Sequence, residues 1–392
     1  MQFRHLPILA LASLITAQNG SSNDTQSLNA TLSGNDQLSN LTSFLSLAPG
    51  ILQALSNATN ITILAPSNDA FIEFGSSGMG SAIASDPGML AALLQYHVLN
   101  GMYQASAITN QSAFVPTLLS NETYANVTGG QVVEAVTVGN DTVFYSGLLH
   151  NSTVTTADVN FTGGVVHIID RVLTLPPGIL DVANALNLTS FRGAVNATDE
   201  VQKANDRDVT IFAPNNEAFK SIGSALANLS SDDVQSIIEY HIVDSVHYST
   251  SLENGTTLQS SDNDQEFAIT INENGTIFVN AAEVVVPNVL IANGVLHIID
   301  NVLNPNNTAA PSESATAGAP GFTGSAASEQ PFTSGQPTPT TQVNPTEEGA
   351  GPTQTEAPAS SSSPSGAAMP LMTGGVEYAA LFGAGAVAVF GF

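Results

Sequence analysis

The chain has 392 residues, 33 acidic side chains against 6 Lys and Arg, a formal net charge of −27 and no cysteine. The missing cysteines exclude disulfides, thiolate metal centres and cysteine nucleophiles. The charge argues against nucleic acid as a partner, because an acidic surface repels a phosphate backbone. The length allows two ordinary domains plus tails, and domains of that size can bury a core without disulfides.

The first segment reads as a secretory signal peptide over residues 1–17. Arg4 and His5 precede an apolar run over residues 6–15, and the small residue Ala17 follows. A basic start, a short apolar run and a small-residue end are the three parts of such a signal. The apolar run is too short to span a bilayer, which disfavours a membrane anchor.

The segment "ITILAPSNDAF" (61–71) predicts a strand that turns directly into a helix. Its first residues are β-formers, Pro66 ends the ladder and Ser67 can cap the helix that follows. Phe71 should lie on the buried side. The next helix starts at Ser85 or Asp86 with Pro87 in its first turn, and it ends on Tyr96 and His97. A hairpin follows, with its turn at Asn140-Asp141.

The same blocks return later in the same order, which indicates a duplicated domain. "VTIFAPNNEAF" (209–219) repeats the strand-to-helix corner, and "IIEYHIVDS" (237–245) repeats "LLQYHVLNG" (93–101). A second hairpin turns at Asn274-Gly275. Each copy closes on a shared phrase, "GGVVHIIDRVL" (163–173) and "NGVLHIIDNVL" (293–303). The repeats predict two domains, over residues 35–175 and 176–304.

The composition changes after the second repeat. Residues 305–366 are rich in Ser, Thr, Pro, Gly and Ala without apolar periodicity, which predicts a disordered and O-glycosylated stalk. Small residues at 366–368, a spacer and an apolar tail then resemble a glycosylphosphatidylinositol attachment signal. We expect attachment at Gly366 and removal of residues 367–392.

Asn-X-Ser/Thr sequons occur eighteen times, which predicts a heavily N-glycosylated surface. Asn187 is expected to be poorly accessible because it falls in a predicted amphipathic helix. The main candidates within the two domains are Asn57, Asn60, Asn110, Asn121, Asn126, Asn140, Asn151, Asn160, Asn196, Asn228, Asn254 and Asn274.

Four histidines occupy equivalent positions in the two repeats: His97 with His241, and His167 with His297. They could form a metal or catalytic pair in each domain, or they could be core histidines with a hydrogen-bond partner. The core interpretation is favoured, because each lies on an apolar stripe and no carboxylate shares a metal-ligand spacing with it. The chain also lacks the motifs of hydrolases and phosphate-binding loops, so we expect no catalysis, no metal and no cofactor.

The three duplicated blocks together resemble the fasciclin domain family over roughly residues 35–304. The resemblance implies an α+β fold, with each domain a twisted β-sandwich or wedge packed against helices. It also implies adhesion or matrix attachment without enzymatic activity. In that family the Tyr-His block and an Asp-Ile pair have been linked to partner binding. The matching candidates here are Tyr96, His97, Asp158, Tyr240, His241 and Asn288.

The resulting hypothesis is a cell-surface adhesion glycoprotein on the extracellular face of the plasma membrane or in the cell wall, held by its lipid anchor. Its expected partners are other surface, matrix or wall proteins or glycans, including a second copy of the chain, and its only membrane contact is the anchor. The alternative is a glycoprotein of an internal, vacuole-like membrane that acts in membrane contact or fusion.

Overall fold

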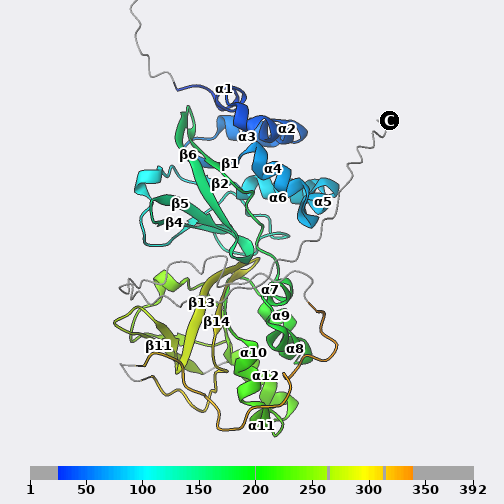
Figure 1. Cartoon of the computed structure of the whole chain (residues 1–392), viewed down its shortest axis with the longest axis vertical. Helices are drawn as coiled ribbons and strands as arrows, with labels where there is room; N and C mark the ends of the chain where they lie inside the picture. Colours follow the sequence, from blue (N-terminus) through cyan, green and yellow to red (C-terminus); the bar gives the residue numbers. More distant parts are fainter. Residues whose placement is uncertain (1–24, 199, 263–264, 312–314, 339–392) are drawn as a thin grey trace, which may run out of the picture. The chain divides into compact units, whose positions relative to one another are not determined.

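A computed structural model describes residues 25–198, 200–262, 265–311 and 315–338. The predicted signal peptide, the attachment site Gly366 and the apolar C-terminal tail lie outside the described residues. Residues 26–175 and 176–304 form two α+β domains with their own core clusters (Figure 1). The α+β prediction is confirmed.

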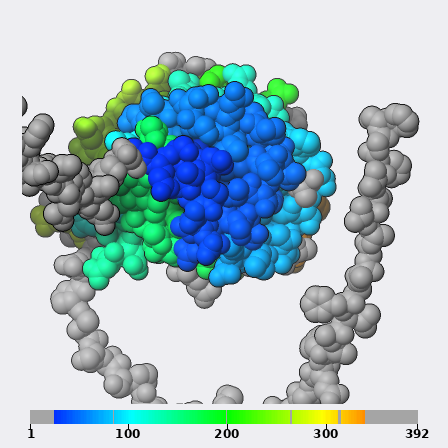
Figure 2. Space-filling model, turned by 90° about the horizontal axis from the view of Figure 1, so that it is seen from above, coloured from blue at the N-terminus to red at the C-terminus, as the bar shows by residue number. Residues whose placement is uncertain are grey.

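The helices of domain 1 lie along one side of its sheet (Figure 1). Figure 2 shows the N-terminal helices, in blue, gathered on one face of the molecule. The helices are α1 (Leu28–Ser33), α2 (Ser39–Leu47), α3 (Pro49–Asn57), α4 (Asn68–Gly75), α5 (Gly78–Ser85) and α6 (Pro87–Tyr96), with short 3₁₀ turns η1 (Asp36–Leu38), η2 (Ala105–Ala107) and η3 (Gly147–Leu149).

The seven strands of domain 1 follow the order β2-β1-β7-β6-β5-β4-β3. Only β1 and β7 pair in parallel; the other neighbours are antiparallel. The bridge between Leu99 and Thr117 joins the two edge regions, so the sheet closes on itself like a barrel rather than forming two separate layers. The strands are β1 (Ile61–Pro66), β2 (Val98–Asn100), β3 (Ala113–Pro116), β4 (Val132–Val138), β5 (Asp141–Tyr145), β6 (Asn151–Phe161) and β7 (Gly164–Ile169).

Domain 2 repeats this topology with the strand order β10-β11-β12-β13-β14-β8-β9. Its strands are β8 (Val209–Pro214), β9 (Ile242–Val243), β10 (Thr257–Gln259), β11 (Glu266–Ile271), β12 (Ile277–Val279), β13 (Ala282–Ile291) and β14 (Gly294–Ile299). Its helices are α7 (Ile179–Ala185), α8 (Thr189–Ala197), α9 (Val201–Ala204), α10 (Asn216–Ser221), α11 (Gly223–Leu226) and α12 (Ser231–Tyr240), with the 3₁₀ turn η4 (Ser249–Ser251).

The predicted strand-to-helix corner is present in both domains. The hydroxyl of Ser67 accepts a hydrogen bond from the Ala70 amide, and the side chain of Asn215 accepts one from the Ala218 amide. These side-chain acceptors satisfy amides that a helix start leaves unpaired. Asp86, rather than Ser85, caps α6. The corner therefore fixes how β1 and β8 lead into the helices that cover the core.

The contacts of domain 1 extend beyond its predicted start at residue 35, because Leu28 and Leu32 of α1 are buried in its core. The segment 315–336, which we call the strap and which falls in the predicted stalk, is hydrogen-bonded along domain 2. Phe322 and Phe332 pack on the domain 2 core. The sequence did not predict this contact, because two isolated aromatic residues in a Gly- and Ser-rich segment form no periodic apolar pattern.

Within the described part of the chain, no single helix is long and apolar enough to cross a membrane. The helical segments 36–47 and 49–57 are long and apolar enough only when they are taken together, and the angle between them is 111°.

Candidate functional site

The Tyr-His block sits at the end of α6 and α12, where each helix turns into a short strand. The Tyr96 hydroxyl donates to the Val132 carbonyl at 2.9 Å, so it links the helix to β4. The Tyr240 hydroxyl donates to the Glu266 carbonyl at 2.8 Å and accepts from the Asn280 side chain at 3.0 Å. Both tyrosines are fully buried. Each therefore ties its helix to the sheet from inside the core.

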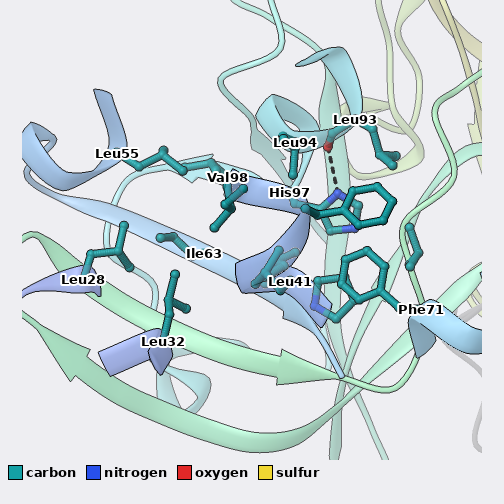
Figure 3. Close-up of a pocket in the computed structure, with 15 residues that line it drawn as sticks. Leu28, Leu32, Leu41, Leu55, Ile63, Phe71, Leu93, Leu94, His97 and Val98 are labelled. Atoms are coloured by element: carbon teal, nitrogen blue, oxygen red, sulfur yellow. Dashed lines mark hydrogen bonds between the residues drawn. The ribbon is translucent and has the colours of Figure 1, made fainter. Parts of the chain in front are cut away.

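His97 joins the same helix end to the segment after β7. Its Nδ1 lies 2.8 Å from the Leu93 carbonyl, and its Nε2 accepts from the Leu173 amide at 2.9 Å. These contacts fix the neutral ring with its proton on Nδ1. Burial lowers the pKa of His97 to about 4, so the ring stays uncharged. Figure 3 shows His97 among apolar side chains, beside the Leu93 carbonyl to which it donates.

His241 repeats this arrangement in domain 2. Its Nδ1 lies 2.6 Å from the Ile237 carbonyl, and its Nε2 accepts from the Leu303 amide at 2.9 Å. Burial lowers its pKa to about 4 as well. Because both ring nitrogens are used by backbone groups, neither His97 nor His241 has a lone pair left for a metal.

His167 and His297 use the opposite tautomer to support a bend in the long strands β6 and β13. His167 Nε2 lies 2.7 Å from the Tyr103 carbonyl, and its Nδ1 accepts from the Asp158 amide at 3.2 Å. His297 Nε2 lies 2.9 Å from the His247 carbonyl, and its Nδ1 accepts from the Asn288 amide at 3.3 Å. Burial lowers the pKa of His297 to about 4.

Asp158 and Asn288 occupy the same left-handed bend, with φ of 57° and 63°. Asp and Asn tolerate this conformation better than most residues. Each side chain accepts a hydrogen bond from a backbone amide, that of Ala105 for Asp158 and that of Ser249 for Asn288. The Asp158 side chain is 37% exposed, whereas Asn288 is buried. The shared position therefore has a structural role that either residue can fill.

The partner-binding role that the resemblance implied does not fit five of the six candidates. Direct contact requires accessible atoms, but the following residues are buried: Tyr96, His97, Tyr240, His241 and Asn288. Asp158 is half-buried and remains a candidate. The four repeat-equivalent histidines are core residues, as their apolar stripes predicted. No group of three or more His, Cys, Asp or Glu side chains with metal-site geometry occurs among the described residues.

The predicted glycosylation sites lie on the surface. Asn126 and Asn151 are half-buried, and the other candidates named from the sequence are exposed. Asn187 is also exposed, in a left-handed turn between α7 and α8, so the expectation that it is poorly accessible is wrong. The sequence pattern that predicted one helix around Asn187 did not reveal the turn that separates α7 from α8.

The closed seven-stranded sheet, its helical cover and the duplicated Tyr-His and strand-bend contacts define a tandem pair of α+β domains with the same topology. The fasciclin domain family model matches residues 36–176 and 186–305, and the chain belongs to this family.

Relatives span fungi and animals. The chain is 38% identical to the "Fasciclin-like arabinogalactan protein" of Arthroderma benhamiae over 73% of this chain and 68% of that one. It is 30% identical to "Fasciclin-like arabinogalactan protein CTB11" of Cercospora beticola, over 81% and 85%. Human "Periostin" is 29% identical over 66% of this chain and 30% of its own.

A solved fasciclin domain pair from the insect cell adhesion molecule Fasciclin I matches with 23% identity and a TM-score of 0.33, over 67% of this chain and 96% of that one.

Proposed function

We propose that the protein is a non-enzymatic adhesion glycoprotein of the cell surface, displayed on a lipid anchor outside the plasma membrane or in the wall. The observation that carries the proposal is the pairing of two fasciclin domains with exposed sequons spread over both. The names of the relatives, which include fasciclin-like arabinogalactan proteins and Fasciclin-1, support the same class.

The buried histidines and tyrosines favour a binding module over an enzyme. Their polar atoms are bonded to backbone groups of the same domain, so they are committed to holding the fold. A general base needs a ring nitrogen that can reach a substrate proton. Recognition then falls to exposed faces and loops, where weak contacts gain strength from many copies facing one another.

Bead aggregation tests the adhesion function. Beads carrying the native ectodomain, and beads carrying the enzymatically deglycosylated form, are mixed with each other and with cells. Clustering or cell attachment is expected for at least one form. If neither form clusters or attaches to cells, the proposed adhesion function is wrong.

Release by phosphatidylinositol-specific phospholipase tests the anchor and the compartment separately. Treatment of intact cells should release the full-length product into the medium. Replacement of the small residues at 366–368 by bulky ones should prevent that release. Retention in an internal membrane after treatment would favour the internal-membrane alternative instead.

A further inference from the structure

The strap covers a defined path on domain 2. The Gly318 amide donates to Asp300 at 3.1 Å, and the Gly321 carbonyl accepts from the Asn304 side chain at 2.9 Å. Farther along, the Ser325 amide donates to the Ser224 hydroxyl at 2.7 Å. Phe322 packs between these two contacts against the core of domain 2. The strap thus lies between the segment after β14 and the start of α11.

The path continues over α10 and α8. The Ala327 amide donates to the Lys220 carbonyl at 2.8 Å, and the Phe332 ring meets the Phe219 ring edge-on at 5.9 Å. Gly223 has no side chain to obstruct this route: a Cβ there would lie 2.3 Å from the Cβ of Ala327. Domain 2 is therefore shaped to accept an extended segment with aromatic side chains between small residues.

The equivalent path on domain 1 is a hollow of about 320 Å³. By the repeat register, Val172 and Thr174 correspond to Val302 and Asn304, and the α4 end corresponds to the α10 end. The hollow lies between these two elements. Its lining includes Ala70, Glu73, Phe74, Met79, Arg171 and Val172.

Two further positions show that this path is uncovered by the described residues. Gly75 corresponds to Gly223, but a Cβ on Gly75 would meet nothing within 4 Å. Ile72 corresponds to Lys220, whose carbonyl receives the strap, and Ile72 is 64% exposed. An exposed apolar residue beside a hollow is a feature of interaction surfaces. No sequon falls in residues 61–109, but the Asn151 sequon lies beside Arg171 at the hollow, so the binding assays use the deglycosylated chain.

One residue changes the chemistry of the site. Arg171 replaces Asn301, and none of the ion pairs between described residues involves Arg171. Its guanidinium donates to the Asn151 side chain at 2.7 Å, which leaves donors for another acceptor. In domain 2, a Cβ on Gly318 would lie 2.3 Å and 2.5 Å from the carboxylate oxygens of Asp300, and Asp170 corresponds to Asp300 in domain 1. A segment that follows the same path on domain 1 therefore needs a glycine beside Asp170, because a side chain there would meet its carboxylate.

We propose that the hollow of domain 1 is a peptide-binding groove. Its occupant is an extended segment of a partner protein that carries an aromatic side chain between small residues and a glycine four residues before it. The aromatic ring takes the place that Phe322 takes in domain 2, and the glycine amide donates to Asp170 as the Gly318 amide donates to Asp300. This inference goes beyond adhesion and holds whatever cell surface the protein serves.

Fluorescence anisotropy with the full chain tests the groove. The probe is a labelled peptide of residues 318–328. We expect saturable binding of one peptide per chain, since the strap already fills the path on domain 2. A peptide that carries Phe322→Ala should bind at least tenfold more weakly. Absence of saturable binding by the first probe would overturn the proposal.

Protein variants locate the binding. A peptide with Gly318→Glu should bind at least several-fold more weakly, because its side chain would meet the Asp170 carboxylate. Glu73→Trp should block the strap peptide by filling the rim, whereas Gln53→Trp, at an exposed position of α3, is the matched control. Binding that survives Glu73→Trp would place the peptide elsewhere and refute the groove.

Sedimentation of the unlabelled chain separates an external segment from a second copy. We expect a monomer at the concentrations of the binding assay. A dimer that disappears with Phe322→Ala would show exchange of straps between copies and would overturn the choice of an external partner.

Discussion

The ring of Phe114 in domain 1 stacks on the ring of Tyr248 in domain 2, with centroids 3.9 Å apart and planes 7° from parallel. Polar contacts accompany the stack: the Gln131 side chain donates to the Ile291 carbonyl at 3.0 Å, and Arg207 pairs with Glu122 at 3.0 Å. Gln131 is fully buried. The two domains therefore share a packed contact rather than only a peptide link.

The aromatic stack should give a measurable coupling between domains. A double-mutant cycle with Phe114→Leu and Tyr248→Leu is expected to show about 0.5–1.5 kcal/mol of interaction in the free energy of unfolding by urea. The control cycle combines Phe114→Leu with Phe71→Leu, whose ring instead contacts Phe44 within domain 1. The control should be additive. A coupling of zero for the first pair would mean that the stack contributes nothing in solution.

The buried hydroxyls of the two tyrosines should differ in their contribution. Tyr96→Phe removes the hydroxyl that donates to the Val132 carbonyl, whereas Tyr240→Phe removes both the donor to the Glu266 carbonyl and the acceptor of the Asn280 side-chain NH2 group. Each unpaired buried group costs about 1–3 kcal/mol. We therefore expect Tyr240→Phe to lower the melting temperature more than Tyr96→Phe does.

Adhesion measured at a temperature where both tyrosine variants remain folded supplies the second readout. Unchanged bead clustering is expected, because both hydroxyls are inside the domains. Lost clustering with an unchanged melting temperature would show that the Tyr-His block acts in recognition after all.

The duplicated motifs predicted much of the fold because each one carries its own local cause. Pro66 ends a strand, Ser67 caps a helix and the Asn274-Gly275 turn closes a hairpin, so these elements follow from nearby residues. The buried interpretation of His97 followed in the same way from its apolar stripe.

Long-range contacts without a periodic pattern could not be predicted. The strap is held by backbone groups and two isolated phenylalanines, and its composition is that of a disordered segment. Closure of the sheet through Leu99 and Thr117 likewise depends on register between distant strands. The groove on domain 1 was missed for the same reason, since its walls come from α4, α5 and the segment after β7.

The Asp158→Asn substitution separates a structural from a recognition role at the half-buried bend of β6. Asn occupies the equivalent bend at position 288 and accepts the same type of backbone hydrogen bond. The substitution should change the free energy of unfolding by less than about 0.5 kcal/mol, the usual range for a surface change of this kind. It creates no new sequon.

Adhesion of the Asp158→Asn variant then reports on the carboxylate alone. If Asp158 has only the structural role, clustering should be unchanged, with or without divalent cations. Asp158→Val is the comparison variant, because a β-branched residue is strained at positive φ and lacks the acceptor. Loss of clustering in the Asn variant at unchanged stability would assign recognition to the carboxylate.

The stability of the protein should depend on two opposing sets of buried groups between pH 4 and 7. Burial lowers the pKa of His97, His241 and His297 to about 4, below the ordinary value of 6.5. The unfolded chain thus binds more protons on these groups, and stability is lost as the pH falls from 6.5 toward 4. Burial raises the pKa of Glu134 to about 7, although its hydrogen bond from Ser112 partly opposes this.

Glu134 acts in the opposite direction from the histidines. The folded state holds its proton more tightly, so the stabilising contribution is complete below pH 4.5 and is lost as the pH rises through 7. Glu134→Gln keeps a neutral group of the same shape. The variant should be more stable than the wild type by up to about 3 kcal/mol at pH 8, since one pKa unit corresponds to about 1.4 kcal/mol, and nearly equal to it at pH 4.

Melting temperatures from pH 4 to 8 check this expectation. Without the opposing contribution of Glu134, the variant should lose stability more steeply on acidification than the wild type does. Glu273→Gln, in the exposed turn after β11, is the matched control and should follow the wild-type curve. Parallel curves for wild type and Glu134→Gln would contradict the assignment, because they would mean that Glu134 is ionised in the folded protein at neutral pH.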